Sequence, residues 1–230
     1  MPFYKGEDGS RLHYSVAGSG RPALLFIHGW CGNLKHWDHQ ARVFSRKHRV
    51  LRVDRRGDGR SDTPEHGYRP HEQADEIAAL ARSLRMRSVV AIGHAGGSPA
   101  TLALATRHPR LVKALVVIDW SPDLRPLDQR RQVGQLPVDG YEEALAERYR
   151  GYFGAAADRR QVKAWAAEAA QTPRHVAMAN REGLAATSYT ALLRRVSQPT
   201  LWINSTLRNA GKLAHLPLML SSSFPLLAFP

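Results

Sequence analysis

The sequence predicts an α/β protein in which helices flank a mostly parallel β-sheet. Short apolar runs and helical stretches alternate strictly from residue 12 to residue 119, and that alternation is typical of parallel sheets with helices on both faces. A long stretch rich in Ala, Arg and Glu then follows, from Ser121 to Arg195, before another apolar run at 199–203. The sheet is therefore expected to resume after a helical cap, inserted behind the strand that ends at Asp119.

The apolar runs predict strands at residues 12–16, 23–27, 50–53, 88–92, 114–118 and 199–203. The run at 23–27 is continuously apolar, as in a strand that is covered on both faces. Apolar positions at helical spacing predict helices over residues 36–47, 70–86 and 97–107. Functional loops of such sheets lie beyond the carboxyl ends of the strands, which is where the sequence places His28, Asp54, Ala95 and Asp119.

This pattern divides the chain into four parts. Residues 1–120 form the first part of the core, 121–195 the helical cap and 196–204 a further core strand. The tail, 205–230, is rich in Leu, Ser and Pro and has no acidic residue, so we expect a disordered or frame-shifted segment there. No internal repeat is evident.

Composition narrows the class of protein. The net charge is +13 and most of the 33 basic residues are arginine. The arginines are scattered along the sequence rather than gathered into one basic segment, which favours a solvated surface and predicts no nucleic-acid partner. With a polar N-terminus, no membrane-spanning run and the single cysteine Cys31, we expect a cytoplasmic protein with no membrane partner, no disulfide, no metal and no cofactor.

The segment Gly93-His94-Ala95-Gly96-Gly97 has the outline of G-x-S-x-G, the sharp turn between a strand and a helix that presents a nucleophile. Ala95 stands at the nucleophile position, where a methyl group cannot attack a carbonyl. A natural loss, an engineered inactivation and a reaction without a serine nucleophile all fit this residue. Ser98, one helical turn further on, is expected to point along the helix.

Together with this turn, three more segments carry a resemblance to capped proteins of the α/β-hydrolase fold: Phe26-Ile27-His28-Gly29-Trp30, residues 54–61, and Pro199-Thr200-Leu201-Trp202-Ile203. The order and spacing of the four segments agree with that family from about residue 12 to residue 204.

The resemblance implies roles for single residues. Backbone N–H groups of Trp30 and Gly96 would form an oxyanion hole, with His28, His94 and Trp120 nearby, although the two histidines are more typical of turn supports. Asp119 would be the acid of a triad, with Asp123 as the local alternative. The family's late histidine has only His215 as a counterpart, in a setting unlike the family's histidine loop.

The predicted function is therefore small-molecule hydrolysis of an ester, amide or related bond by descent, impaired here by Ala95 and by the missing late histidine. Two alternatives stay open: a non-catalytic ligand-binding pseudoenzyme, and a relative of the cofactor-free ring-cleaving dioxygenases of this fold. The expected ligand is a small apolar or aromatic molecule under the cap. A truncated or frame-shifted product would also explain the change of composition after Asn204.

Overall fold

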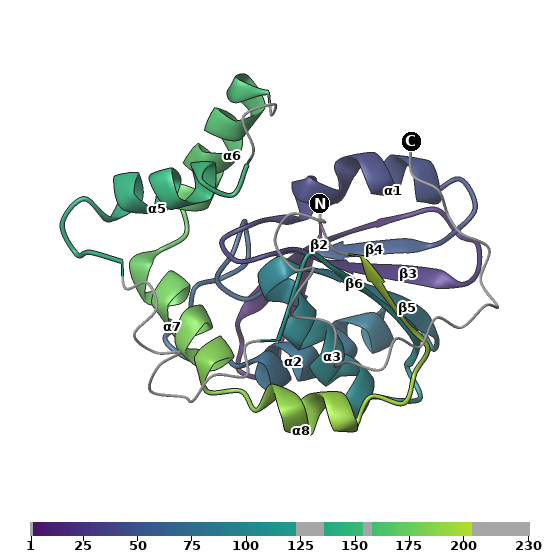
Figure 1. Ribbon diagram of the computed structural model, residues 1–230. Helices are drawn as coiled ribbons and strands as arrows, with labels where there is room; N and C mark the ends of the chain where they lie inside the picture. The colour runs from purple at the N-terminus through teal and green to yellow at the C-terminus, as the bar shows by residue number, and fades with distance from the viewer. Residues whose placement is uncertain (1, 123–135, 154–157, 204–230) are drawn as a thin grey trace.

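The computed structural model describes residues 2–122, 136–153 and 158–203. Seven strands form one sheet in the order β1-β2-β4-β3-β5-β6-β7 (Figure 1). The pairs β1/β2 and β2/β4 are antiparallel, and β4, β3, β5, β6 and β7 run parallel. The bounds are β1 Phe3–Lys5, β2 Arg11–Ala17, β3 Ala23–Ile27, β4 Val50–Val53, β5 Val89–His94, β6 Val112–Ile118 and β7 Thr200–Ile203.

Helices cover both faces of this sheet (Figure 1). On one face α1 (Asp38–Phe44) packs with Trp37 against Leu24 and Phe26 of β3. On the other, α2 (Pro70–Ser83) and α3 (Ser98–Arg107) bury a larger core with Leu25 and Leu115. Because β3 is sandwiched between these layers, all five of its residues are buried, as its continuous apolar run predicts.

Among the residues described after β6, four helices follow: α5 Tyr141–Arg150, α6 Arg159–Ala170, α7 Arg174–Ala185 and α8 Tyr189–Arg194. Helices α5 to α7 project beyond one end of the sheet, whereas α8 lies beside α3 (Figure 1). The last helix of the stretch predicted as cap, residues 121–195, is thus packed on the core.

Local interactions account for where these helices begin and end. Pro70 occupies the first position of α2, and the Glu72 carboxylate accepts the backbone N–H of Arg69 at 2.8 Å. The helix expected over 36–47 is instead a 3-10 turn, Leu34–Trp37, followed by α1. Asn33 starts that turn early by accepting the Lys35 N–H through its side chain at 2.9 Å. None of the helices that the structure describes has the length and apolar content that crossing a bilayer requires.

Candidate active site

The turn after β5 has the geometry of a nucleophile elbow. Ala95 has a φ of 45°, in the left-handed region that side chains other than glycine rarely adopt. A Cβ on Gly97 would lie 2.2 Å from the His28 carbonyl oxygen, and one on Gly93 would lie 2.2 Å from Thr101 Oγ1. Only glycines therefore allow the 3-10 turn Ala95–Gly97, and α3 directly after it, to lie this close to the strand ends.

The two turns expected to form an oxyanion hole lie against each other. A Cβ built on Gly96 would sit 2.9 Å from the backbone nitrogen of Trp30 and 2.9 Å from its Cβ. A Cβ on Gly29 would lie 3.5 Å from the Cβ of Ala95. The structure thus brings Trp30, Gly96 and Ala95 into one small region, as the oxyanion arrangement needs.

Backbone strain gathers at this same edge of the sheet. Cys31, Ala95 and Asp119 have φ values of 51°, 45° and 49°, and they follow β3, β5 and β6, which are neighbours in the sheet. A left-handed residue other than glycine costs about 1–2 kcal/mol. Such residues persist only where the surrounding structure over-determines them, and they cluster at functional sites.

Asp119 directly follows the strand beside the elbow. Ile118 pairs with His94 across β6 and β5, so residues 95 and 119 leave neighbouring strand ends. The backbone N–H of Asp119 donates to the Ile203 carbonyl at 2.7 Å, which fixes the position of its turn. Burial lowers the pKa of His94, and the charge of Asp119 opposes that shift only in part.

His28 has both ring nitrogens engaged by the backbone. Its Nε2 accepts the Arg55 N–H at 2.9 Å, and its Nδ1 lies 2.8 Å from the Gly29 carbonyl oxygen. Because Nε2 accepts, the proton resides on Nδ1 and the ring is neutral. Burial and the nearby guanidinium of Arg55 lower its pKa well below the usual value. His28 therefore holds two turns together and contributes no proton transfer.

Asp54 holds the loop that follows β4. Its carboxylate accepts backbone N–H groups from Leu34 at 2.6 Å and from Arg60 at 3.0 Å, and lies 2.6 Å from Nδ1 of His13. A Cβ at Gly59 would lie 2.4 Å from the Asp54 carboxyl carbon, and the φ of Gly59 is 59°. Asp54 is therefore a structural anchor for this loop.

A buried ion pair lies beneath both turns of the site. The Arg55 guanidinium donates to Asp58 at 2.9 Å, to the Gly29 carbonyl at 3.1 Å and to Gln73 at 3.2 Å. It also lies 3.5 Å from the Gly96 carbonyl oxygen. The sequence analysis did not predict this ion pair. The three-residue spacing of Arg55 and Asp58, in a loop with charges of both signs, is the signal that could have indicated it.

This polar network continues into the cap. Gln73 donates to Asn180 of α7 at 2.8 Å, and Thr172 lies 3.5 Å from Asp58. Trp30 adds a direct link, because its Nε1 donates to the Ala177 carbonyl at 3.0 Å. Helix α7, in the stretch predicted as cap, and the turn at Trp30 are thus tied together by hydrogen bonds as well as by packing.

The cap contributes aromatic side chains above the oxyanion turn. Phe153 and Trp165 pack against a buried group that we call the Trp30 cluster. The cluster consists of Trp30, Cys31, Leu136, Leu145, Ala146, Tyr149, Ala166, Ala169 and Ala177. His36 lies 5.6 Å from the Trp165 ring, and its buried Nε2 has no hydrogen-bond partner among the described residues. On the other side of the site Trp120 stacks on Trp202 at 5.9 Å and meets Tyr189 edge-on at 5.3 Å.

The remaining candidates are either packed in the interior or lie outside the described residues. Ser98 is fully buried and its hydroxyl donates to the Gly93 carbonyl at 3.1 Å, so it faces back toward the strand. Burial raises the pKa of the Cys31 thiol well above its usual value, which leaves it protonated and packed. Asp123, His215 and the tail 205–230 lie outside the described residues. In the described part of the chain no three His, Cys, Asp or Glu side chains converge as a metal site.

Comparison with known proteins agrees with this geometry. A family model described as the alpha/beta hydrolase fold matches residues 22–161. A non-heme haloperoxidase of Rhodococcus erythropolis is 38% identical over 151 residues, which are 63% of this chain and 54% of that protein. The 2-(acetamidomethylene)succinate hydrolase of Mesorhizobium japonicum is 37% identical over 146 residues, 60% of this chain and 52% of that one.

The chain spans about half the length of the curated relatives that it matches. Among solved structures, a hydrolase from Pseudomonas aeruginosa PA01 superposes with a TM-score of 0.77 at 25% identity, covering 89% of this chain and 79% of that one. These similarities confirm the predicted fold class of a mostly parallel sheet with flanking helices.

Proposed function

This chain belongs to the α/β-hydrolase family, and from that premise we propose that it binds a small acyl compound at the elbow, by descent a hydrolase substrate, with hydrolysis impaired. One observation carries the proposal: Cys31, Ala95 and Asp119 keep a strained backbone at three neighbouring strand ends, while residue 95 has no nucleophilic atom. The framework of an acyl-transfer site is thus present without its reactive oxygen.

The ligand's carbonyl oxygen would accept backbone N–H groups from Trp30 and Gly96. Support comes from the close approach of these two residues, whose turns are held by the Arg55 guanidinium from below. Such donors favour an oxygen that gains negative charge, and removing one costs on the order of 10²–10³ in rate where catalysis occurs.

Ala95 would stop the reaction before a covalent intermediate forms. Removing the serine of a catalytic triad lowers kcat by about 2 × 10⁶. Asp119 would orient a base in an intact relative, but the sequence offers only His215 beyond residue 203. We therefore propose that two parts of the triad are deficient within residues 1–230, and that supplying the hydroxyl alone restores no turnover in a protein of this sequence.

The ligand would be apolar or aromatic on the side that faces the cap. Phe153 and Trp165 pack against the Trp30 cluster, and their rings lie 5.2 Å apart. Aromatic walls stabilise an aromatic ligand through dispersion and ring contacts. The name of one relative, a 2-(acetamidomethylene)succinate hydrolase, agrees with an acyl ligand.

Binding of phenyl acetate, followed by quenching of tryptophan fluorescence, tests the ligand class. We expect saturable quenching in the wild type and weaker binding in Gly96→Ala, because the new Cβ presses on Trp30. Gly151→Ala is the matched control, since its Cβ would have only ordinary contacts, the nearest at 3.4 Å. Absence of saturable quenching in the wild type, or equal weakening by both substitutions, would contradict the binding proposal.

Hydrolysis of p-nitrophenyl acetate tests the impairment separately. We expect the buffer rate in the wild type and in Ala95→Ser, and we expect Ala95→Ser to leave phenyl acetate binding intact. Turnover above the buffer rate in either protein would contradict the proposal that the triad is incomplete, whatever the binding result.

A further inference from the structure

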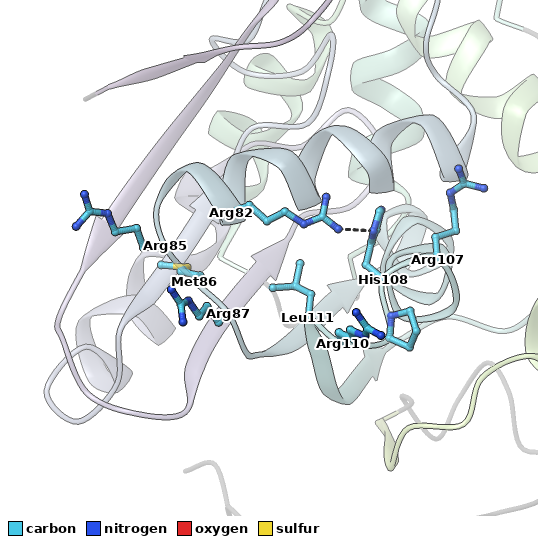
Figure 2. Close-up of a pocket in the computed structure, with 9 residues that line it drawn as sticks. Arg82, Arg85, Met86, Arg87, Arg107, His108, Arg110 and Leu111 are labelled. Carbon is cyan, nitrogen blue, oxygen red and sulfur yellow. Dashed lines mark hydrogen bonds between the residues drawn. The ribbon is translucent and has the colours of Figure 1, made fainter.

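Five arginines from two short segments of the sequence, residues 82–87 and 107–110, line one hollow of the fold. The hollow measures about 770 Å³, and its lining contains Arg82, Arg85, Arg87, Arg107 and Arg110 (Figure 2). They come from the segments that lead from α2 into β5 and from α3 into β6. The pairing of Val89 with Val112 brings these segments together at the amino ends of the two strands, which is the sheet edge opposite the elbow.

Two of these arginines are held in place by a chain of hydrogen bonds. Arg107 donates to both oxygens of Asp75 at 2.7 and 2.6 Å. His108 lies between Asp75 and Arg82. Its Nε2 is 2.8 Å from a carboxylate oxygen of Asp75, and its Nδ1 is 2.7 Å from the guanidinium of Arg82 (Figure 2). Arg82 can only donate, so His108 accepts at Nδ1 and donates from Nε2.

The other three arginines keep their charge uncompensated. Arg85, Arg87 and Arg110 are exposed, and within the described ranges no carboxylate lies at ion-pair distance from them. None of the nine lining residues is acidic. Like charges gathered around a hollow repel one another, and a bound anion would relieve that repulsion.

Arg85 also occupies a backbone position that glycine would fill better. Its φ is 58°, and it follows the end of α2, where the Met86 N–H donates to the Ala81 carbonyl at 2.9 Å. Glycine is the residue that this type of helix end usually carries. The chain thus keeps an arginine at a strained backbone position beside the hollow, which favours a role in binding over a merely solvated surface.

We propose that this Arg85 groove, lined by the five arginines with Met86, His108, Pro109 and Leu111, binds a small anion with several phosphate groups. The planar fork of arginine matches phosphate oxygens in pairs, unlike the point charge of lysine. A terminal phosphate carries about −1.5 to −2 charges at pH 7. Several phosphates are required to reach arginines distributed around the whole hollow.

The lining also argues against a nucleic-acid strand. Single-stranded nucleic acids combine a basic groove with aromatic rings on which the bases stack. The Arg85 groove has no Phe, Tyr or Trp ring, and its one imidazole, that of His108, is held by Asp75 and Arg82. The buried side chains in its lining are the aliphatic ones of Met86 and Leu111. A chain of phosphates without bases therefore fits the groove best.

Calorimetric titration with inorganic tripolyphosphate at about 50 mM salt tests the proposal. We expect saturable binding, and a dissociation constant that rises about tenfold or more in the triple variant Arg85→Gly, Arg87→Ala, Arg110→Ala. The matched control removes three exposed cationic groups from α6, by Arg159→Ala, Arg160→Ala and Lys163→Ala. The control should bind like the wild type, although its net charge falls by the same amount.

Three results would overturn the proposal: no saturable binding, equal weakening in the triple variant and the α6 control, or citrate or a single-stranded oligonucleotide binding as tightly as tripolyphosphate. Circular dichroism checks that the variants fold. Should the triple variant fail to fold, the same titration of the single variant Arg110→Gln tests the proposal. This substitution changes one exposed side chain that has no partner among the described residues. We expect it to weaken binding about threefold, and unchanged binding would count against the groove.

Discussion

Replacing the buried Arg55 by methionine should destabilise the protein strongly and in a manner that depends on pH. The Arg55 side chain is 2% exposed and that of its partner Asp58 is fully buried. Methionine keeps much of the volume but removes the positive charge, along with the hydrogen bonds to Gly29, Gln73 and Asp58.

The magnitude follows from the state of the remaining carboxyl group. Breaking a buried ion pair by removing one partner costs about 3–5 kcal/mol, because the other charge is left uncompensated. We therefore expect the free energy of unfolding of Arg55→Met to fall by about that amount at pH 8. The free energy of unfolding of a typical domain is only about 5–15 kcal/mol, so the expected loss is a large part of the total stability.

Acidification should return part of this loss. Burial raises the pKa of Asp58 from 3.8 to about 7 even with Arg55 beside it, and loss of the guanidinium raises it further. A carboxyl whose pKa is higher in the folded state binds protons there that the unfolded chain releases, so its penalty shrinks as the pH falls. Each unit of additional pKa shift is worth about 1.4 kcal/mol. The free energy of unfolding that Arg55→Met loses relative to the wild type should therefore be smaller at pH 5.5 than at pH 8.

Urea unfolding followed by circular dichroism at the two pH values measures both effects. Arg150→Met on α5 is the control, since Arg150 pairs with Glu147 and Glu143 on an exposed face and should change little at either pH. A loss below about 1 kcal/mol at pH 8, or an equal loss at both pH values, would refute the reasoning that Asp58 is left as a buried charge.

Three further outcomes are expected. Ala95→Gly should raise the free energy of unfolding by about 1 kcal/mol, because the φ of 45° costs glycine nothing; an unchanged midpoint in urea would show that the turn is not strained. Arg85→Gly should raise the free energy of unfolding by a similar amount, because glycine adopts the positive φ after the end of α2 without strain. The measurement is the Tm, which should rise; a lower Tm would contradict the strain inferred at this helix end. Burial lowers the folded-state pKa of His28, His36 and His94 below 6.5, so their contribution to stability is present above that pH and declines as the pH falls below it. The buried Asp58 acts in the opposite direction over the same range, so the decline is measured by comparing the wild type with His36→Phe in urea titrations from pH 7.5 to 5.5. The wild type should lose stability relative to the variant as the pH falls, and an equal pH dependence of the two proteins would contradict this prediction.

The sequence predicted the elements that depend on neighbours along the chain. The strand at 50–53 was predicted to the residue, and α3 was predicted within one residue of Ser98–Arg107. The glycines around Ala95 indicated the sharp turn, and the structure explains them: a Cβ added at Gly97 would collide with the His28 carbonyl oxygen, and one added at Gly93 with Thr101. These features follow from hydrophobic period and turn chemistry, which are local properties.

The interactions of charged side chains could not be predicted in this way. The same loop contains Asp54, which accepts backbone N–H groups, and Arg55, which lies beneath the oxyanion turn. Nothing in the order of the residues distinguishes these roles from those of exposed charges. The difference arises because distant segments, among them α2 and α7, close over the loop and leave its polar groups only protein partners.

The sequence by itself determined the parallel sheet, the position of the elbow and the absence of an oxygen at Ala95. The tertiary structure alone decided that His28 holds two turns, and that arginines scattered from residue 82 to residue 110 meet in one groove. The reason is physical: a strand or turn is specified by residues a few positions apart, whereas a buried pair or a charged hollow is specified by which strand ends the sheet brings together.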